Sequence, residues 1–314
     1  MQRIPLLQTD FSCDKVFSVI HMKEKIKGTA CLLLATIIWG STFIAQSVGM
    51  DHIGPFTFLA VRSLMACGFL FPLSWFMDQE KSWFREKWMN PKLWKTGLLT
   101  GFAMFMAAGA QQMGMVHTTA GKAGFLTAMY IVLVPVLGCF LGNRPPFTVW
   151  ISVAMAVAGL YFLSGAGLDR INIGDILLIF CAFWFAVQII WIDRYGLGLD
   201  GVRLNCVQAL VCGVFSSIAM LILEDISPDA ILACWLPLCY AGILSTGVAF
   251  TLQIYGQKSL GPTQASVIMS LESVFALISG WLVLNERLSF MESLGCVIMF
   301  CAVILSQIPK KSPA

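Results

Sequence analysis

Apolar residues run through the chain in long stretches that are separated by short polar segments. A helix needs about 20 mostly apolar residues to cross about 30 Å of hydrocarbon. Ten such stretches follow one another, near residues 28–48, 55–77, 94–115, 119–141, 147–165, 172–192, 204–223, 233–255, 262–284 and 289–307. Lipid offers the backbone no hydrogen bonds, so each stretch must be helical, and the alternating pattern of membrane strands is absent. The pattern predicts an all-α membrane protein with ten transmembrane helices.

This hydrophobic pattern also occurs twice, at one constant offset. Aligned pairs include Gln111 with Gln253, Ala123 with Ala265, and Asn143 with Asn285. The duplicated unit holds five predicted spans, and an odd number places the second copy in the opposite orientation across the bilayer. We therefore predict two inverted five-helix repeats, at 25–165 and 172–308, which is an architecture of secondary transporters.

The segment before the first span is polar and mixed in character, with no apolar core long enough for a cleavable signal peptide. The charged stretch Met22–Lys27 resembles the natural start of a membrane protein. We expect residues 1–24 to be a disordered cytoplasmic tail, or in part a start assigned too far upstream.

Composition and charge support a membrane protein and suggest its orientation. With 58% hydrophobic and 12% charged residues and a mean hydropathy of +0.81, the chain has too little polar surface for a soluble globule. If the spans alternate, the loops on one side hold most of the Lys and Arg residues. Cytoplasmic loops retain basic residues, so both termini should be cytoplasmic, in a bacterial inner membrane. The net charge of +3 is dispersed over loops, which disfavours a nucleic-acid partner.

The eleven cysteines fall mostly within predicted spans, and no pair has the C-x-x-C spacing of metal ligands. We interpret them as small packing residues that stay reduced. No structural disulfide, metal or cofactor is expected.

Four short motifs stand out, namely Trp39–Phe43 and Tyr130–Pro135 in the first half, and Ser270–Phe275 and Asn285–Ser289 in the second. In this order they resemble the EamA family of the drug/metabolite transporter superfamily. The resemblance covers about residues 25 to 307. It implies a ten-helix carrier with a central cavity formed mainly by spans 1, 3, 4, 6, 8 and 9. It also implies transport of small organic metabolites, amino acids or drugs, many of them moved outward.

The chain departs from this family at two positions. Ser273 stands where the family usually has proline, and Asn285 stands where glycine is more common. The missing proline removes a residue that kinks helices. The gating geometry of relatives is therefore not carried over.

Glu272 lies about ten residues into the ninth predicted span, near the middle of the bilayer. An ionisable group there is costly unless it faces a wet cavity or a partner, so its default interpretation is functional. It is a candidate acceptor for a proton or for a substrate ammonium group. The alternative is a packing carboxyl that is hydrogen-bonded to a neighbouring helix.

Lys122 opens the fourth predicted span. Gly121 precedes it, but Ala123 stands where a phosphate loop needs Ser or Thr, so no ATP site is expected. Lys122 either snorkels to the headgroups or points inward toward a substrate carboxylate.

Arg62 lies about two turns inside the second predicted span. Spans 2 and 7 are peripheral in related folds. We therefore expect a structural or gating role, in which Arg62 caps or bridges helices with its five donors.

Further polar and aromatic residues are candidates for lining the transport path. Gln111 and Gln253 hold equivalent repeat positions at mirrored depths, so they could serve two alternating gates or form interhelical hydrogen bonds. Trp39, Gln46 and Tyr130 are additional lining candidates, and each could equally be an interfacial anchor or a packing residue.

These features favour a secondary-active exporter of a small organic solute that works by alternating access as a monomer or homodimer. Proton antiport through Glu272 is the preferred form of coupling. The rival classes are an intramembrane enzyme and a non-transporting membrane partner. An enzyme is disfavoured because neither H-E-x-x-H nor G-x-S-x-G occurs in the sequence.

Overall fold

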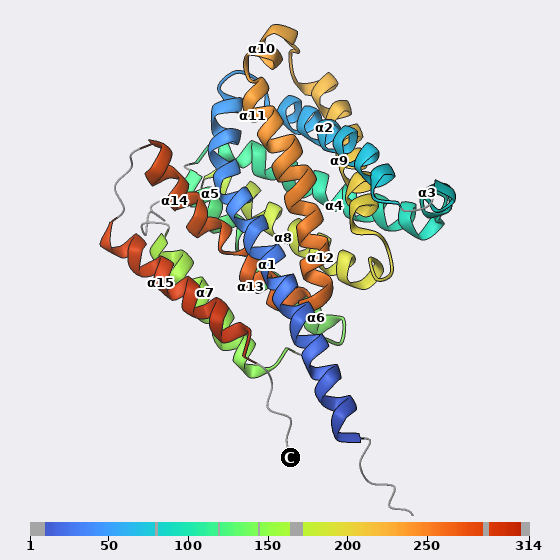
Figure 1. The fold of residues 1–314 in the computed structure, drawn as a ribbon. Coiled ribbons are helices and arrows are strands. Elements are labelled where there is room, and N and C mark those ends of the chain that lie inside the picture. The colour runs from blue at the N-terminus through green and yellow to red at the C-terminus, as the bar shows by residue number, and fades with distance from the viewer. Residues whose placement is uncertain are drawn as a thin grey trace, which may run out of the picture.

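The computed structural model describes residues 10–78, 81–118, 120–143, 145–163, 172–284 and 289–308, and every regular element in these ranges is a helix. In chain order the elements are α1 (Asp10–Met50), α2 (Pro55–Phe76), α3 (Lys81–Trp88), α4 (Pro91–Met115), α5 (Ala120–Thr127), α6 (Tyr130–Phe140), α7 (Phe147–Leu163), α8 (Ile173–Tyr195), α9 (Gly201–Leu223), α10 (Pro228–Ala233), α11 (Trp235–Cys239), the π-helix η1 (Tyr240–Ala249), α12 (Phe250–Leu260), α13 (Pro262–Met269), α14 (Glu272–Leu284) and α15 (Phe290–Ser306). They pack into one helical bundle (Figure 1).

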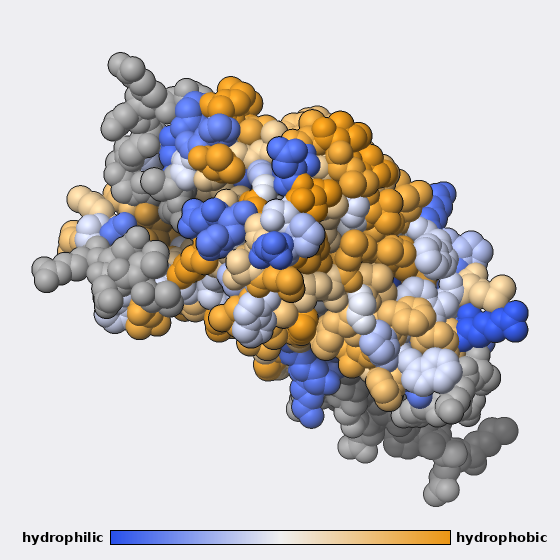
Figure 2. Space-filling model, turned by 90° about the horizontal axis from the view of Figure 1, so that it is seen from above, coloured by the Kyte–Doolittle hydropathy of each residue, from blue (hydrophilic) through white to orange (hydrophobic). Residues whose placement is uncertain are grey.

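The predicted all-helical membrane fold is confirmed. Seven helical segments in the described ranges are long and apolar enough to cross a membrane, and α7 and α15 are apolar but have only 17 residues each. The 25-residue α4 is not among the seven. We attribute this to Gln111, Gln112 and two lysines, which lower its hydropathy. Broad hydrophobic areas remain on the outer surface (Figure 2), as lipid-facing helices require. The count of ten spans stays a prediction.

Helix α1 begins at Asp10, well before the first predicted span. The helix therefore reaches into residues 1–24, the segment expected to be a disordered tail. Residues 1–9 lie outside the described part of the chain.

The fourth and ninth predicted spans are broken rather than continuous. One turn at Ala128–Met129 separates α5 from α6, and another at Ser270–Leu271 separates α13 from α14. The Ser270 hydroxyl donates to the Val267 carbonyl at 2.8 Å, and such local bonds compete with the helical ladder. The ninth span thus breaks without the family's proline. Each break places one candidate residue, Tyr130 or Glu272, at the first position of a half-helix.

Helices α2 and α9 run antiparallel and are joined at both ends. At one end the Glu224 carboxylate accepts hydrogen bonds from the backbone nitrogens of Phe56 and Thr57, at 2.7 and 2.8 Å. Glu224 thereby satisfies free donors at the start of α2. At the other end, buried Asp78 pairs with Arg203 of α9 and with Lys87. This double clamp fixes α2, which carries Arg62, beside the bundle core.

Helices α7 and α15 lie side by side at the edge of the bundle (Figure 1). A Cβ atom at Gly295 would lie 2.7 Å from the Gly159 carbonyl oxygen. The two backbones therefore approach as closely as small residues allow in membrane helix pairs.

Candidate functional site

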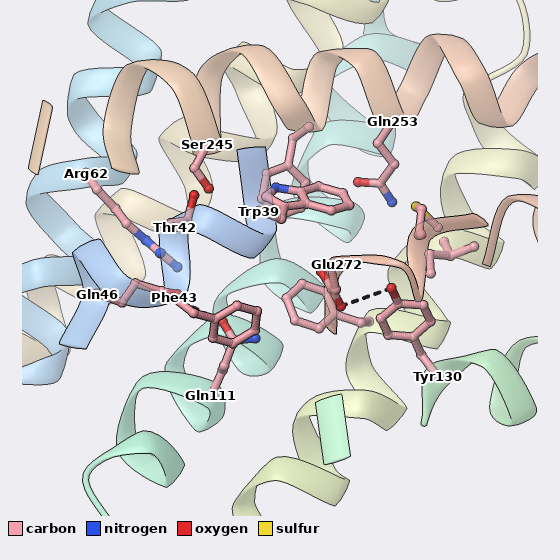
Figure 3. Close-up of a pocket in the computed structure, with 14 residues that line it drawn as sticks. Trp39, Thr42, Phe43, Gln46, Arg62, Gln111, Tyr130, Ser245, Gln253 and Glu272 are labelled. Atoms are coloured by element: carbon pink, nitrogen blue, oxygen red, sulfur yellow. Dashed lines mark hydrogen bonds between the residues drawn. The ribbon is translucent and has the colours of Figure 1, made fainter. Parts of the chain in front are cut away.

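A central cavity lies among helices from both halves of the chain. Its lining residues belong to α1, α2, α4, α6 and α8, and to η1, α12, α13 and α14. Seven of the eight candidate residues from the sequence line it, namely Trp39, Gln46, Arg62, Gln111, Tyr130, Gln253 and Glu272. Figure 3 shows these side chains around one space. Residues scattered over more than 230 positions of the sequence, from Trp39 to Glu272, thus converge.

Tyr130 and Glu272 meet at one end of this cavity. The tyrosine hydroxyl donates a hydrogen bond of 3.0 Å to Glu272 Oε1, and both side chains are buried (Figure 3). Glu272 is also the first residue of α14, where the backbone dipoles of the helix favour a negative charge. The contact joins the first half of the chain to the second.

Aromatic and amide groups form part of the cavity wall. The rings of Trp39 and Phe250 meet edge to face with their centroids 4.9 Å apart. In the described structure, Trp39 Nε1 and Gln253 Oε1 are buried without a hydrogen-bond partner. An unsatisfied buried polar atom is costly, so these two atoms are available to a bound molecule.

Arg62 lines the cavity from α2. Its side chain is 4% exposed and lines the cavity, and its Nε has no partner within the described residues. Its guanidinium carbon lies 5.8 Å from the centre of the Phe58 ring, which stacks against the cation. Glu224 and Arg203 provide the contacts at the two ends of α2, and the structural or gating role expected for Arg62 stays a prediction.

The structure places Lys122 in an ion pair between two helices. Its Nζ lies 2.8 Å from Asp175 Oδ2, in an ion pair that links α5 to α8. Asp175 also forms the capping box of α8 with Asn172. This pairing depends on residues far apart in the sequence. The lysine therefore serves an interhelical contact outside the cavity lining.

Glutamines form two clusters beside the cavity. Gln46 Nε2 lies 3.5 Å from Gln111 Oε1 and also donates to Gln112. Gln253 Nε2 donates to Gln188 Oε1 at 3.3 Å. The interhelical bonding considered for Gln111 and Gln253 is therefore present, and both residues still line the cavity.

Several lining residues escaped the sequence interpretation. Thr42 and Phe43 lie within the motif at Trp39–Phe43, whose spacing could have identified them. Ser245 lies in the π-helix η1, and apolar periodicity gives no sign of such a local widening. Phe185, Phe250 and Met269 resemble ordinary core residues in the sequence.

The helices and the cavity together define a multi-pass membrane protein with a polar internal site. A sequence profile described as the EamA-like transporter family matches residues 26–165 and 172–307. The chain belongs to the EamA-like transporter family. It is a membrane transporter, and a small-molecule substrate follows from this membership.

Relatives extend over most of the chain. An "uncharacterized transporter" of Archaeoglobus fulgidus is 32% identical over 278 residues, which cover 87% of this chain and 83% of the relative. The "uncharacterized transporter YoaV" of Bacillus subtilis is 23% identical over 88% of this chain and 94% of its own. The "uncharacterized inner membrane transporter YedA" of Escherichia coli K12 is 25% identical over 87% of this chain and 88% of its own.

A known crystal structure shares the fold. It superposes with a TM-score of 0.73 at 17% identity, over 89% of this chain and 96% of that one. The similarity shows the arrangement of the helices alone. The names of the relatives point to transport rather than to an enzyme.

Proposed function

We propose that the protein is a secondary-active carrier that exports a small organic solute by alternating access. The central cavity binds the solute, and two inverted five-helix halves expose it first to one side of the membrane and then to the other. The observation that carries this proposal is the Tyr130–Glu272 contact. It joins the two halves at the cavity, through residues that start half-helices in both.

The paired glutamines support an inverted relationship between the halves. Gln46 and Gln111 approach each other in the first half, and Gln188 and Gln253 do so in the second. The second pair follows the first at the same offset that relates the two sequence repeats. Inversion places equivalent pairs toward opposite faces of the membrane, where each can close one side of the cavity.

Glu272 is the proposed coupling group. It lines the cavity, and only one of its oxygens accepts the bond from Tyr130. A carboxylate in this place can exchange a proton for solute within each cycle. The carrier is then a proton antiporter.

Counterflow in liposomes tests the carrier. Purified protein is reconstituted with an excess of one unlabelled solute inside, and the labelled solute is added outside. The panel includes amino acids, nucleosides, sugars, carboxylates and cationic drugs. A carrier produces transient accumulation of label above equilibrium for at least one solute, which protein-free liposomes do not show. Flux without this overshoot indicates a pore, and no flux for any solute with monodisperse protein contradicts the proposal.

A further inference from the structure

Arg62 is a buried cation that has no counter-ion among the described residues. Its guanidinium is always protonated, and its side chain is 4% exposed in the central cavity. No hydrogen bond or ion pair involves its side chain in the described part of the chain, and its guanidinium carbon lies 5.8 Å from the centre of the Phe58 ring. A buried charge without a partner is strongly unfavourable. The site is therefore electrostatically incomplete without an anion.

By contrast, Arg203, which is also deeply buried in the described structure, has carboxylate counter-ions, although its Nε, like that of Arg62, lacks a hydrogen-bond partner. Arg203 pairs with Asp78, donates to the Ser74 carbonyl at 3.2 Å, and lies 3.5 Å from Asp200. Arg203 has the carboxylate and carbonyl partners that are typical of an arginine with a structural role. Arg62 differs because its donors face a cavity instead of protein acceptors.

The surroundings of Arg62 are suited to a small anion. Figure 3 shows the guanidinium directed into the cavity near Thr42 and Gln46, with Ser245 close by. These neighbours add hydroxyl and amide groups that can complete the coordination of oxygen atoms. Glu272 and Tyr130 lie together elsewhere in the same cavity, which separates the acidic part of the site from the basic one.

We infer that Arg62 forms an anion subsite and that the transported solute carries a carboxylate. A guanidinium binds a carboxylate through two parallel hydrogen bonds. One cation matches a monoanion better than a phosphate dianion, and Arg62 and Glu272 are the charged side chains among the described lining residues. Trp39, Phe43 and Phe250 then contact an apolar body attached to the carboxylate. This inference rests on the proposed carrier function.

Binding of matched compounds to the wild-type protein tests this subsite. One set shares a phenyl group and consists of 3-phenylpropanoate, phenylalanine, 3-phenylpropanamide and 2-phenylethylamine. A second set shares a branched aliphatic group and consists of 4-methylpentanoate, leucine, 4-methylpentanamide and 3-methylbutylamine. In at least one set, we expect the carboxylates to bind about tenfold to a hundredfold more tightly than the amide and the amine. Equal affinity of acid and amide, preference for the amine, or no binding to folded protein overturns the inference.

Variants then assign the preference to one residue. Arg62→Ala should abolish the discrimination between acid and amide, and Arg62→Lys should retain part of it because the charge remains. Lys122→Ala is the matched comparison, since it removes a cation that is already paired with Asp175 outside the cavity lining. Its preference for acids should persist. Loss of the preference in Lys122→Ala alone would contradict the assignment.

The result is separable from the carrier proposal. Each variant is first checked for monodispersity and thermal stability, and the wild-type comparison needs no variant. Counterflow of some solute without a carboxylate preference rejects the anion subsite and leaves the carrier intact. The absence of counterflow for every solute rejects the carrier itself.

Discussion

At the scale of single residues, the cavity has an unusual distribution of charge. Glu272 receives one hydrogen bond from Tyr130, whereas Arg62 has no hydrogen bond to any described residue. Both side chains are buried, so each interacts strongly with any charge that enters the cavity. In our account, Glu272 couples transport to protons and Arg62 binds the solute.

We predict that Glu272→Gln separates coupling from exchange. The glutamine keeps the shape of the side chain but cannot release a proton. Flux driven by a pH gradient should disappear, while counterflow, which needs no net movement of protons, should persist. Both are measured in the same proteoliposomes.

Tyr130→Phe is the control for this prediction. It removes the hydrogen bond but keeps the carboxylate, so flux should remain dependent on the pH gradient. Unchanged pH dependence in Glu272→Gln would remove this residue from the coupling mechanism.

The sequence predicted which residues reach the cavity better than what they do there. Glu272 was identifiable because a carboxyl near the middle of a span needs a reason to be there. The partner of Lys122 was not, because Asp175 lies on another helix and only packing brings them together. Arg62 was assigned a structural or gating role because the second span is peripheral in related folds, and only the packing of the helices shows that it lines the cavity.

At the scale of helices, α2 and α9 are held together by polar contacts at both ends. Burial by itself would raise the pKa of Asp78, but the hydrogen bond from Lys87 and the charge of Arg203 outweigh it. The pKa of Asp78 therefore lies below its ordinary value. The carboxylate is ionised in the folded protein and holds the ends of both helices.

We predict that Asp78→Asn destabilises the protein by about 3 kcal/mol, because it removes the buried counter-ion of Arg203 and leaves only the more distant, partly exposed Asp200. Thermal unfolding of the purified protein measures the change. Lys87→Ala is the control. It should cost much less, since Lys87 is half-exposed and surface pairs contribute little. Equal effects of the two substitutions would contradict the clamp.

The same pair predicts a dependence of stability on pH. A lowered pKa means that the clamp contributes fully above the ordinary Asp value of about 4 and is lost as the pH falls toward the folded value. Wild-type stability should therefore decrease more steeply below about pH 4 than that of Asp78→Asn. Parallel curves would show that Asp78 does not contribute.

Two cysteines test the register of α2 on α9. The Sγ atoms of Cys67 and Cys206 lie 3.6 Å apart, so a small movement brings them to the bond length of about 2.05 Å. Mild oxidation should link them, as detected by mass spectrometry of the digested protein, and Cys206→Ser should abolish the link. A link from Cys67 to Cys212 instead would contradict the observed register.

Helix existence was predictable from hydropathy, whereas the breaks in the fourth and ninth spans were not. Apolar residues continue through Ala128–Met129, so the pattern gives no boundary there, and the polar residues Ser270, Glu272 and Ser273 lie within a stretch that is otherwise apolar on both sides. At the second break, the Ser270 hydroxyl donates a hydrogen bond to the Val267 carbonyl and competes with the helical backbone bonds. The absence of proline at Ser273 therefore did not preserve a straight helix.

At the scale of the whole molecule, the sequence was sufficient for the fold class. Long apolar stretches allow only helices in lipid, and the described structure contains them in the predicted places. The inverted relationship of the halves remains a proposal based on the sequence offset and the glutamine pairs. It requires that equivalent residues become accessible from opposite faces of the membrane.

Paired labelling of positions 111 and 253 tests this accessibility most directly. Each is replaced by cysteine in a background without native cysteines, and a membrane-impermeant thiol reagent is applied to either face of sealed vesicles. Adding a solute that shows counterflow should raise the labelling of one position and lower that of the other, because one cavity opens to one face at a time. Changes in the same direction at both positions, or no change while solute is transported, would contradict alternating access.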